Sequence, residues 1–210
     1  MTTIVHLVRH GEVDNPDRVL YGRMPGYHLS DAGRTMADKA AAFLSGRDLV
    51  LLVSSPLERA VETAAPIAEL TGLAIELDNR LIEAGNSFEG RQVAGGQGKE
   101  LLHPRYWPRY WNPFRPSWGE PYGHIAERVM VAVEDARRAA EDHEAVCVTH
   151  QLPIVVATRR ARGAHLWHDP RRRRCALGSV TSLVFAGTQI VRVDYAEPAG
   201  ETPRGAVAGA

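Results

Sequence analysis

Two spacings of apolar residues alternate along this chain: short continuous runs and helical repeats of three to four positions. Short runs are typical of buried strands, and we predict strands at 4–8, 49–53, 74–77, 145–149, 180–185 and 189–193. Helical spacing fills most intervening segments, with helices predicted at 30–44, after Ser55, at 122–141 and at 151–161. This alternation predicts an α/β fold with three αβα layers and a mainly parallel central sheet.

Two helix starts carry local signals. Ser30 is a suitable N-cap for a helix that ends near Leu44. Ser55 is the predicted N-cap of the next helix, with Pro56 at its first position.

Residues 92–122 interrupt the alternation. They hold three tryptophans, Phe114 and several prolines, which is too aromatic a composition for a disordered linker. We therefore predict a helical or irregular lid, packed over the end of the sheet, within one catalytic domain at 1–195. The remaining residues, 196–210, are rich in Ala, Gly and Pro and are predicted to form a flexible tail.

Size and composition restrict the class of protein. A chain of 210 residues is long enough for one core, and its zero formal net charge gives no overall field to recruit nucleic acid or membrane. No apolar run approaches membrane-spanning length, and the N-terminus lacks a signal-peptide pattern. Cys147 and Cys175 are too few for a disulfide scaffold, so we expect a cytoplasmic protein with Cys147 in its core. The sequence leaves the oligomeric state open, and a homodimer is one alternative, because the edge strands and the lid could each form a dimer face.

Three strands are each followed by a residue suited to phosphate chemistry. Arg9 and His10 follow the first strand, Arg59 lies in the first turn after the second, and His150 directly follows 145–149. The carboxyl ends of parallel strands meet at one edge of a sheet, so these side chains should converge. Arginines would hold a phosphoryl group, and a protonated His150 would add a donor. A neutral His10, its other ring nitrogen donating to a backbone carbonyl, would be the nucleophile, with the Gly11 amide approaching the phosphoryl group.

A leaving alkoxide needs a proton. Glu83, in a loop after a strand, is the predicted acid in preference to Glu89, which is interpreted as a salt-bridge partner. Burial beneath the lid would raise the pKa of Glu83 for this role.

Four sequence blocks in this order resemble the histidine phosphatase superfamily in its phosphoglycerate mutase-like branch. They are Arg9-His10-Gly11-Glu12 with Leu29-Ser30 and Gly33, Ser54 to Ala60 with Thr63-Ala64, Leu81-x-Glu83 with Phe88-Glu89-Gly90, and Val148-Thr149-His150. The resemblance implies that His10 becomes a phosphohistidine and that Arg9, Arg59 and His150 bind the phosphoryl group. It also implies that Glu83 is first the proton donor and then the base that activates water, without a metal or cofactor.

The chain departs from the family pattern in places. Val13 replaces the usual Ser or Thr, and Asn15 fills the family's phosphate-binding Asn position one residue early. Tyr21-Gly22 resembles a substrate-facing pair of the mutases. Gln151 stands where small residues are usual and would line the substrate pocket; its lack of a carboxyl group favours Glu83 as the acid.

The predicted function is hydrolysis of a small phosphomonoester, a phosphorylated metabolite. The alternatives are a mutase that returns the phosphoryl group to another hydroxyl and a catalytically silent phospho-ligand binding protein. The small, largely uncharged C-terminus favours hydrolysis over a mutase.

Three further clusters have competing interpretations. His165 and His168 are spaced for a metal if helical, but without an evident third ligand we interpret them as surface or core residues. Arg171 to Arg174, with three arginines upstream, resemble a nucleic-acid patch and are interpreted instead as a solvated or anion-facing rim. The tryptophans are interpreted as lid core rather than as a platform for bases.

Overall fold

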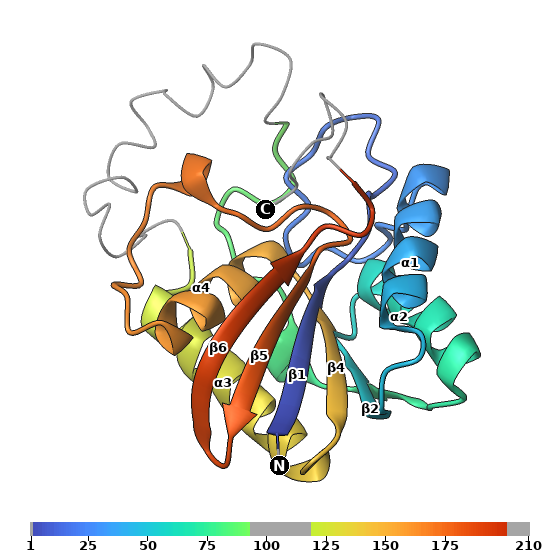
Figure 1. The fold of residues 1–210 in the computed structure, drawn as a ribbon. Coiled ribbons are helices and arrows are strands. Elements are labelled where there is room, and N and C mark those ends of the chain that lie inside the picture. Colours follow the sequence, from blue (N-terminus) through green and yellow to red (C-terminus); the bar gives the residue numbers. More distant parts are fainter. Residues whose placement is uncertain (1, 93–118, 201–210) are drawn as a thin grey trace.

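A computed structural model describes residues 2–92 and 119–200, and its centre is one six-stranded sheet (Figure 1). The strands are β1 (Thr2–Arg9), β2 (Leu49–Ser54), β3 (Ile75–Leu77), β4 (Glu144–Thr149), β5 (Val180–Ala186) and β6 (Gln189–Ala196). Their order is β3-β2-β4-β1-β5-β6, in which the first four are parallel and β5 and β6 add an antiparallel hairpin beside β1. The predicted mainly parallel sheet is confirmed.

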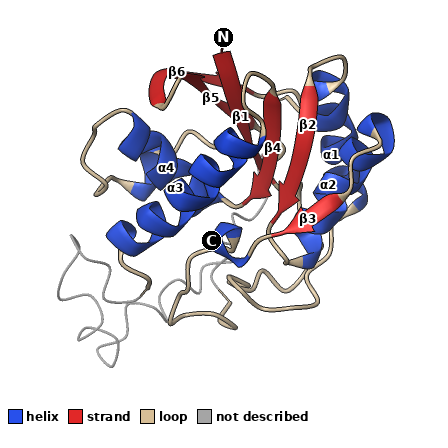
Figure 2. Ribbon diagram, turned by 90° about the horizontal axis from the view of Figure 1, so that it is seen from below, coloured by secondary structure: helices blue, strands red, loops and turns tan. Residues whose placement is uncertain are grey.

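Helices cover both faces of this sheet (Figure 2). They are α1 (Asp31–Leu44), α2 (Glu58–Thr71), α3 (Tyr122–Ala139) and α4 (Gln151–Ala161), with short 3-10 turns η1 (Asn79–Leu81) and η4 (Pro170–Arg172). Alternation along β1 divides the core: Val8 packs in the cluster beneath α1 and α2, and Leu7 in the cluster beneath α3 and α4. The chain therefore has an α/β fold in which helices flank a mixed, mostly parallel sheet.

The two predicted helix starts have different outcomes. The Ser30 hydroxyl accepts a hydrogen bond from the Gly33 amide at 3.0 Å, so Ser30 caps α1 as predicted. The predicted cap at Ser55 is wrong, because α2 begins at Glu58 and its N-cap, Leu57, makes no side-chain capping bond. The Ser55 amide donates to the Val148 carbonyl at 2.9 Å, so the backbone still follows the sheet there and turns helical only afterwards.

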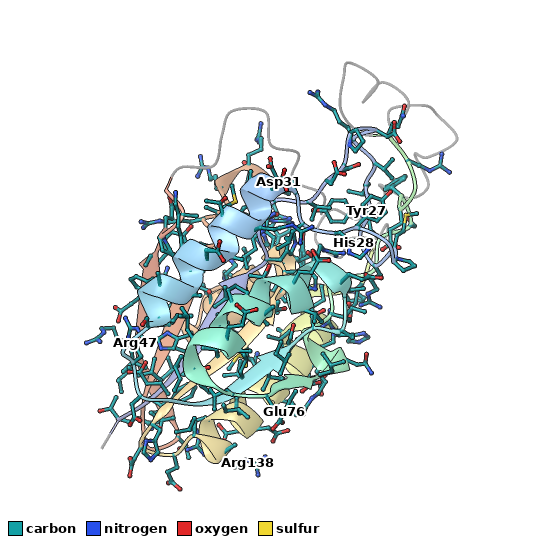
Figure 3. The ribbon with its side chains drawn as sticks, turned by 90° about the vertical axis from the view of Figure 1, so that its right-hand side faces the viewer. Tyr27, His28, Asp31, Arg47, Glu76 and Arg138 are labelled. Atoms are coloured by element: carbon teal, nitrogen blue, oxygen red, sulfur yellow. The ribbon has the colours of Figure 1, made fainter. Side chains whose placement is uncertain are left out.

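The loop after β1 leads to the start of α1 and contacts α2, the two helices on one face of the sheet. Both carboxylate oxygens of Glu62 on α2 hold it, one at 2.5 Å from His28 Nδ1 and the other at 2.7 Å from the Leu29 amide. Figure 3 shows Tyr27 and His28 at the end of the molecule where Asp31 begins α1, whereas Arg47 and Arg138 lie at the opposite end. The loop is thereby held at the carboxyl edge of the parallel strands.

The remaining expectations about the fold are tested only in part. Cys147 is a buried, free core residue, as predicted, and burial raises the pKa of its thiol to about 12. The lid lies outside the described residues except at its two ends, where Gln92 bridges Val19 and Gly119 bridges Asn86. Residue 196, placed in the tail by prediction, ends β6, and residues 201–210 lie outside the described range. Within 2–92 and 119–200, no helix has the length and hydropathy needed to cross a membrane.

Candidate active site

The predicted phosphate residues meet at the carboxyl edge of β1, β2 and β4. Arg9 ends β1 and His10 follows it, Arg59 lies in the first turn of α2, and His150 directly follows β4. Because β4 lies between β1 and β2, these side chains come together, and the rings of His10 and His150 lie 5.1 Å apart between centroids. All four residues are at most 3% exposed, so their charges act in a medium of low dielectric constant.

His10 is held as a neutral imidazole. Its Nδ1 lies 2.8 Å from the Gly11 carbonyl oxygen, a contact that places the ring proton on Nδ1 and leaves the Nε2 lone pair unprotonated. Burial, followed by the charges of Arg59 and Arg9, lowers the pKa of His10 well below its ordinary value. The expected hydrogen bond to a backbone carbonyl is confirmed, and Nε2 has the state a nucleophile needs.

The two buried arginines present donors that no described group accepts. Arg9 Nη1 donates to the Cys175 carbonyl and Arg59 Nη2 to the Gly22 carbonyl, each at 2.6 Å. Within the described residues, Nε of Arg9 and both Nε and Nη1 of Arg59 are buried without a hydrogen-bond partner. Buried unpaired donors cost free energy, and an anion with several acceptor oxygens would satisfy them.

His150 contributes another buried atom of this kind. Its Nε2 lies 2.7 Å from the Ser55 hydroxyl, and its Nδ1 has no partner among the described residues. Burial, then the charges of Arg59, His10 and Arg9, lower the pKa of His150 well below its ordinary value. His150 is therefore neutral in the site without ligand, and its protonation beside a bound phosphoryl group stays a prediction. When the Ser55 hydroxyl donates to Nε2, the ring proton lies on Nδ1, the atom left to donate to a ligand.

Glu83 lies in the loop after η1 and is buried. One carboxyl oxygen accepts from the Ala84 amide at 2.8 Å, and Oε2 has no partner in the described part of the chain. Burial raises the pKa of Glu83, although the Ala84 hydrogen bond and the charges of Arg59 and Arg9 oppose the shift. A protonated carboxyl group with an unengaged oxygen beside an anion site can act as a general acid.

Comparison with known proteins identifies the family. Residues 5–197 match the histidine phosphatase superfamily (branch 1). The chain belongs to this superfamily. Its histidine phosphatase fold carries the buried His10, His150, Arg9 and Arg59 cluster described above.

Individual relatives differ in what is known of them. An uncharacterized protein of Mycobacterium tuberculosis is 54% identical over 94% of this chain and 97% of that protein. A 2,3-bisphosphoglycerate-dependent phosphoglycerate mutase of Thermoplasma acidophilum is 31% identical over 73% of this chain and 74% of that protein. Mycobacterial glucosyl-3-phosphoglycerate phosphatase, solved with inorganic phosphate, superposes with a TM-score of 0.69 and 25% identity over 92% of this chain and 94% of that chain. This member of the superfamily thus has both a phosphatase and a mutase among its relatives.

Residues predicted to face the substrate have contacts inside the protein. The Tyr21 ring lies 4.7 Å from the Arg59 guanidinium carbon, and Gly22 supplies the carbonyl that holds Arg59. The Asn15 amide group donates to the Val19 carbonyl and accepts from the Val19 amide, both at 2.9 Å, so its phosphate contact stays a prediction. Gln151 begins α4, with its side-chain oxygen 3.4 Å from Arg173 Nη1.

The Gly11 amide has a partner within the protein, and its approach to a phosphoryl group stays a prediction. It donates to the Thr63 hydroxyl at 3.1 Å, and that hydroxyl donates to the Arg59 carbonyl at 2.7 Å. A Cβ at Gly11 would lie 2.3 Å from the Gly33 carbonyl oxygen. The close approach of α1 therefore requires glycine at position 11.

The sequence analysis did not predict the contacts that position the candidate catalytic residues. Besides Ser55 and Thr63, the backbone carbonyl of Glu83 accepts from Arg23 Nε at 2.6 Å and from Arg128 Nη2 at 3.3 Å. Both arginines also contact Glu120, at 2.7 Å and 3.0 Å. Arg23, Arg128 and Glu120 are far apart in sequence and belong to none of the family blocks, so only the folded chain reveals their contacts.

The possible metal ligands do not form a site in the described residues. No group of three His, Cys, Asp or Glu side chains there has metal-binding geometry. His165 and His168 lie in the loop after α4 rather than on a helix, and His168 Nδ1 donates to the Leu166 carbonyl at 2.7 Å.

Proposed function

We propose that this histidine phosphatase hydrolyses a small phosphomonoester through a phosphohistidine on His10. The observation that carries the proposal is the set of buried, unsatisfied donors of Arg9, Arg59 and His150 beside His10. A phosphoryl group would satisfy them, because its equatorial oxygens are acceptors and it carries up to two negative charges near neutral pH.

The first step transfers the phosphoryl group to His10. Nε2 attacks phosphorus, the P–N bond forms, and the ester P–O bond breaks in line with it. Arg9 and Arg59 neutralise the charge that would otherwise repel the nucleophile. The leaving alkoxide takes a proton from Glu83, and the raised pKa of Glu83 favours the protonated form that this step requires.

The second step reverses the role of Glu83. Its carboxylate now accepts a proton from water, and the water oxygen attacks phosphorus. The P–N bond breaks, His10 returns to its neutral form, and inorganic phosphate leaves. The Gly11 carbonyl holds the Nδ1 proton throughout, which keeps Nε2 directed at phosphorus.

A mutase is the second candidate, favoured by the similarity to the Thermoplasma acidophilum mutase. It would share the first step and pass the phosphoryl group to another hydroxyl instead of water. The two functions differ in their product, since only hydrolysis releases inorganic phosphate in proportion to the ester consumed.

The test is turnover of a panel of phosphorylated sugars, glycerates, nucleotides and p-nitrophenyl phosphate, with separate assays of phosphate and of phosphorylated product. We expect stoichiometric phosphate release by the parent chain and none by His10→Asn. The control variant, His165→Asn, changes an exposed histidine away from the site and should release phosphate like the parent chain. Product with a relocated phosphoryl group would establish the mutase. Binding of phosphoesters without turnover of any would establish the silent binding protein.

A further inference from the structure

A second cavity, separate in its lining residues from the site above, lies between the outer side of α4, the segment 167–174 and the hairpin β5–β6. Its volume is about 550 Å³, within the range of small-molecule sites. Its lining includes five arginines: Arg159, Arg162, Arg172, Arg173 and Arg174. Neither His10 nor Glu83 is among its lining residues.

These arginines have no acidic partners to explain their gathering. Within the described residues, no carboxylate lies within salt-bridge distance of any of the five, whereas nine other arginines there do form ion pairs. The single carboxylate of the lining, Asp169, is already held by Arg171, at 3.0 Å to Nη2 and 3.1 Å to Nε. The cavity wall thus keeps a net positive charge, and its guanidinium groups repel one another.

Three of the arginines are held in place by contacts that do not neutralise them. Arg159 Nη2 donates to the Trp167 carbonyl at 3.3 Å, and Arg173 Nε donates to His168 Nε2 at 3.0 Å. The Arg174 guanidinium carbon lies 4.6 Å from the centre of the Tyr195 ring. Positioned guanidinium groups lose less entropy on binding an anion than free ones do.

The pKa of His168 is affected by the positive potential of this wall. Burial lowers its pKa, and the charges of Arg173 and Arg159 lower it further, although the Leu166 carbonyl opposes the shift. A neutral His168 accepts the hydrogen bond from Arg173 and adds no charge of its own. All five arginines line this one cavity, an arrangement that suits a compact anion better than a nucleic-acid strand.

We propose that this cavity is a second anion-binding site, for a group carrying a diphosphate or two phosphoryl charges. Several guanidinium groups around one cavity offer the paired donors that phosphoryl oxygens accept bidentately. Such a group has two sources: the far end of a substrate whose other phosphate reaches His10, or a separate anion. Arg173 stands between the two sites, because its Nη1 lies 3.4 Å from the side chain of Gln151, the residue after His150.

The site is tested by calorimetric titration of inorganic pyrophosphate into the whole protein at low ionic strength, which does not depend on turnover. Arg162→Gln/Arg172→Gln removes two exposed guanidinium groups from the lining, and neither makes a hydrogen bond or salt bridge to another described residue, so the fold should tolerate their loss. Arg160→Gln is the matched control: an exposed arginine on α4 that does not line the cavity.

The parent chain and Arg160→Gln are expected to bind one more pyrophosphate than the double variant, whose cavity affinity falls about a hundredfold, or tenfold for each lost contact. Identical isotherms for all three proteins, or no binding by any, would overturn the proposal. A circular dichroism melt verifies that the double variant is folded.

The source of the anion is found by comparing an alkyl monophosphate with the α,ω-bisphosphate of the same chain. If the cavity takes the far end of the substrate, the double variant lowers kcat/KM for the bisphosphate, relative to the monophosphate, by tenfold or more. If it takes a separate anion, that ratio stays constant, while the pyrophosphate site is still lost from the double variant. Either result supports the site and identifies its source.

Discussion

Replacing Glu83 by glutamine tests the assignment of the proton donor. The amide keeps the shape of the side chain and its oxygen can still accept from the Ala84 amide, a bond of 2.8 Å in the parent. What is lost is the proton at Oε2, the buried oxygen without a partner in the described residues. The variant therefore removes acid–base chemistry with little change in packing.

The size of the effect follows from the role. Loss of a positioned general acid or base costs about 10² to 10⁴ in rate, or roughly 3–5 kcal/mol in the barrier. An alkyl phosphate should show the full loss, because its alkoxide leaves poorly without a proton. Formation of the phosphoenzyme from p-nitrophenyl phosphate should be slowed less, since that leaving group needs little protonation.

The assay is kcat/KM against pH for both esters. With the parent chain, turnover of the alkyl ester should fall as pH rises through the raised pKa of Glu83, because the acid is then deprotonated. That limb should vanish in Glu83→Gln and persist in Glu89→Gln, the matched control. Full activity of Glu83→Gln on the alkyl ester would refute the assignment.

Three more outcomes follow from the same contacts. Folding raises the pKa of Glu83, so burial of its carboxylate costs stability above pH 4.5, its ordinary pKa. Glu83→Gln should therefore raise the free energy of unfolding by an amount that is zero below pH 4.5 and grows with pH up to the folded pKa. Urea titrations across pH measure this. Ser55→Ala removes the 2.7 Å contact to His150 and should lower kcat about tenfold, the value of one hydrogen bond, with thermal melting as the check on folding. Gly11→Ala places a Cβ 2.3 Å from the Gly33 carbonyl oxygen and should lower the free energy of unfolding, measured by urea titration, by about 1–3 kcal/mol, whereas Gly123→Ala, with open space around it, should not.

The order of elements was readable from the sequence because apolar spacing is a local signal. Strands 4–8, 49–53 and 145–149 all exist with boundaries shifted by one or two residues. The start of α2 was not readable. Ser55-Pro56 has the composition of a helix start, but the Ser55 amide donates a hydrogen bond to the Val148 carbonyl of β4. This long-range contact overrides the local preference.

Some features of the candidate site could likewise be predicted from the sequence, and others could not. Arg9, His10 and His150 could be placed because each ends or directly follows a strand and the topology of a parallel sheet brings such positions together. The charge of His150 could not be predicted, since its low pKa arises from burial and from neighbours distant in sequence. The arginines that hold the carbonyl of Glu83 were equally invisible, because Arg23 and Arg128 belong to a loop and a helix far apart in the chain.

The central claim is that His10 carries the phosphoryl group. Rapid quenching of the protein with a radioactively labelled phosphoester, followed by peptide mapping, tests it directly. The account predicts an acid-labile, base-stable phosphoenzyme that forms within the first turnover, maps to the peptide containing His10 and is absent from His10→Asn. Turnover of the same ester without any labelled protein, or with the label on another residue, would contradict it.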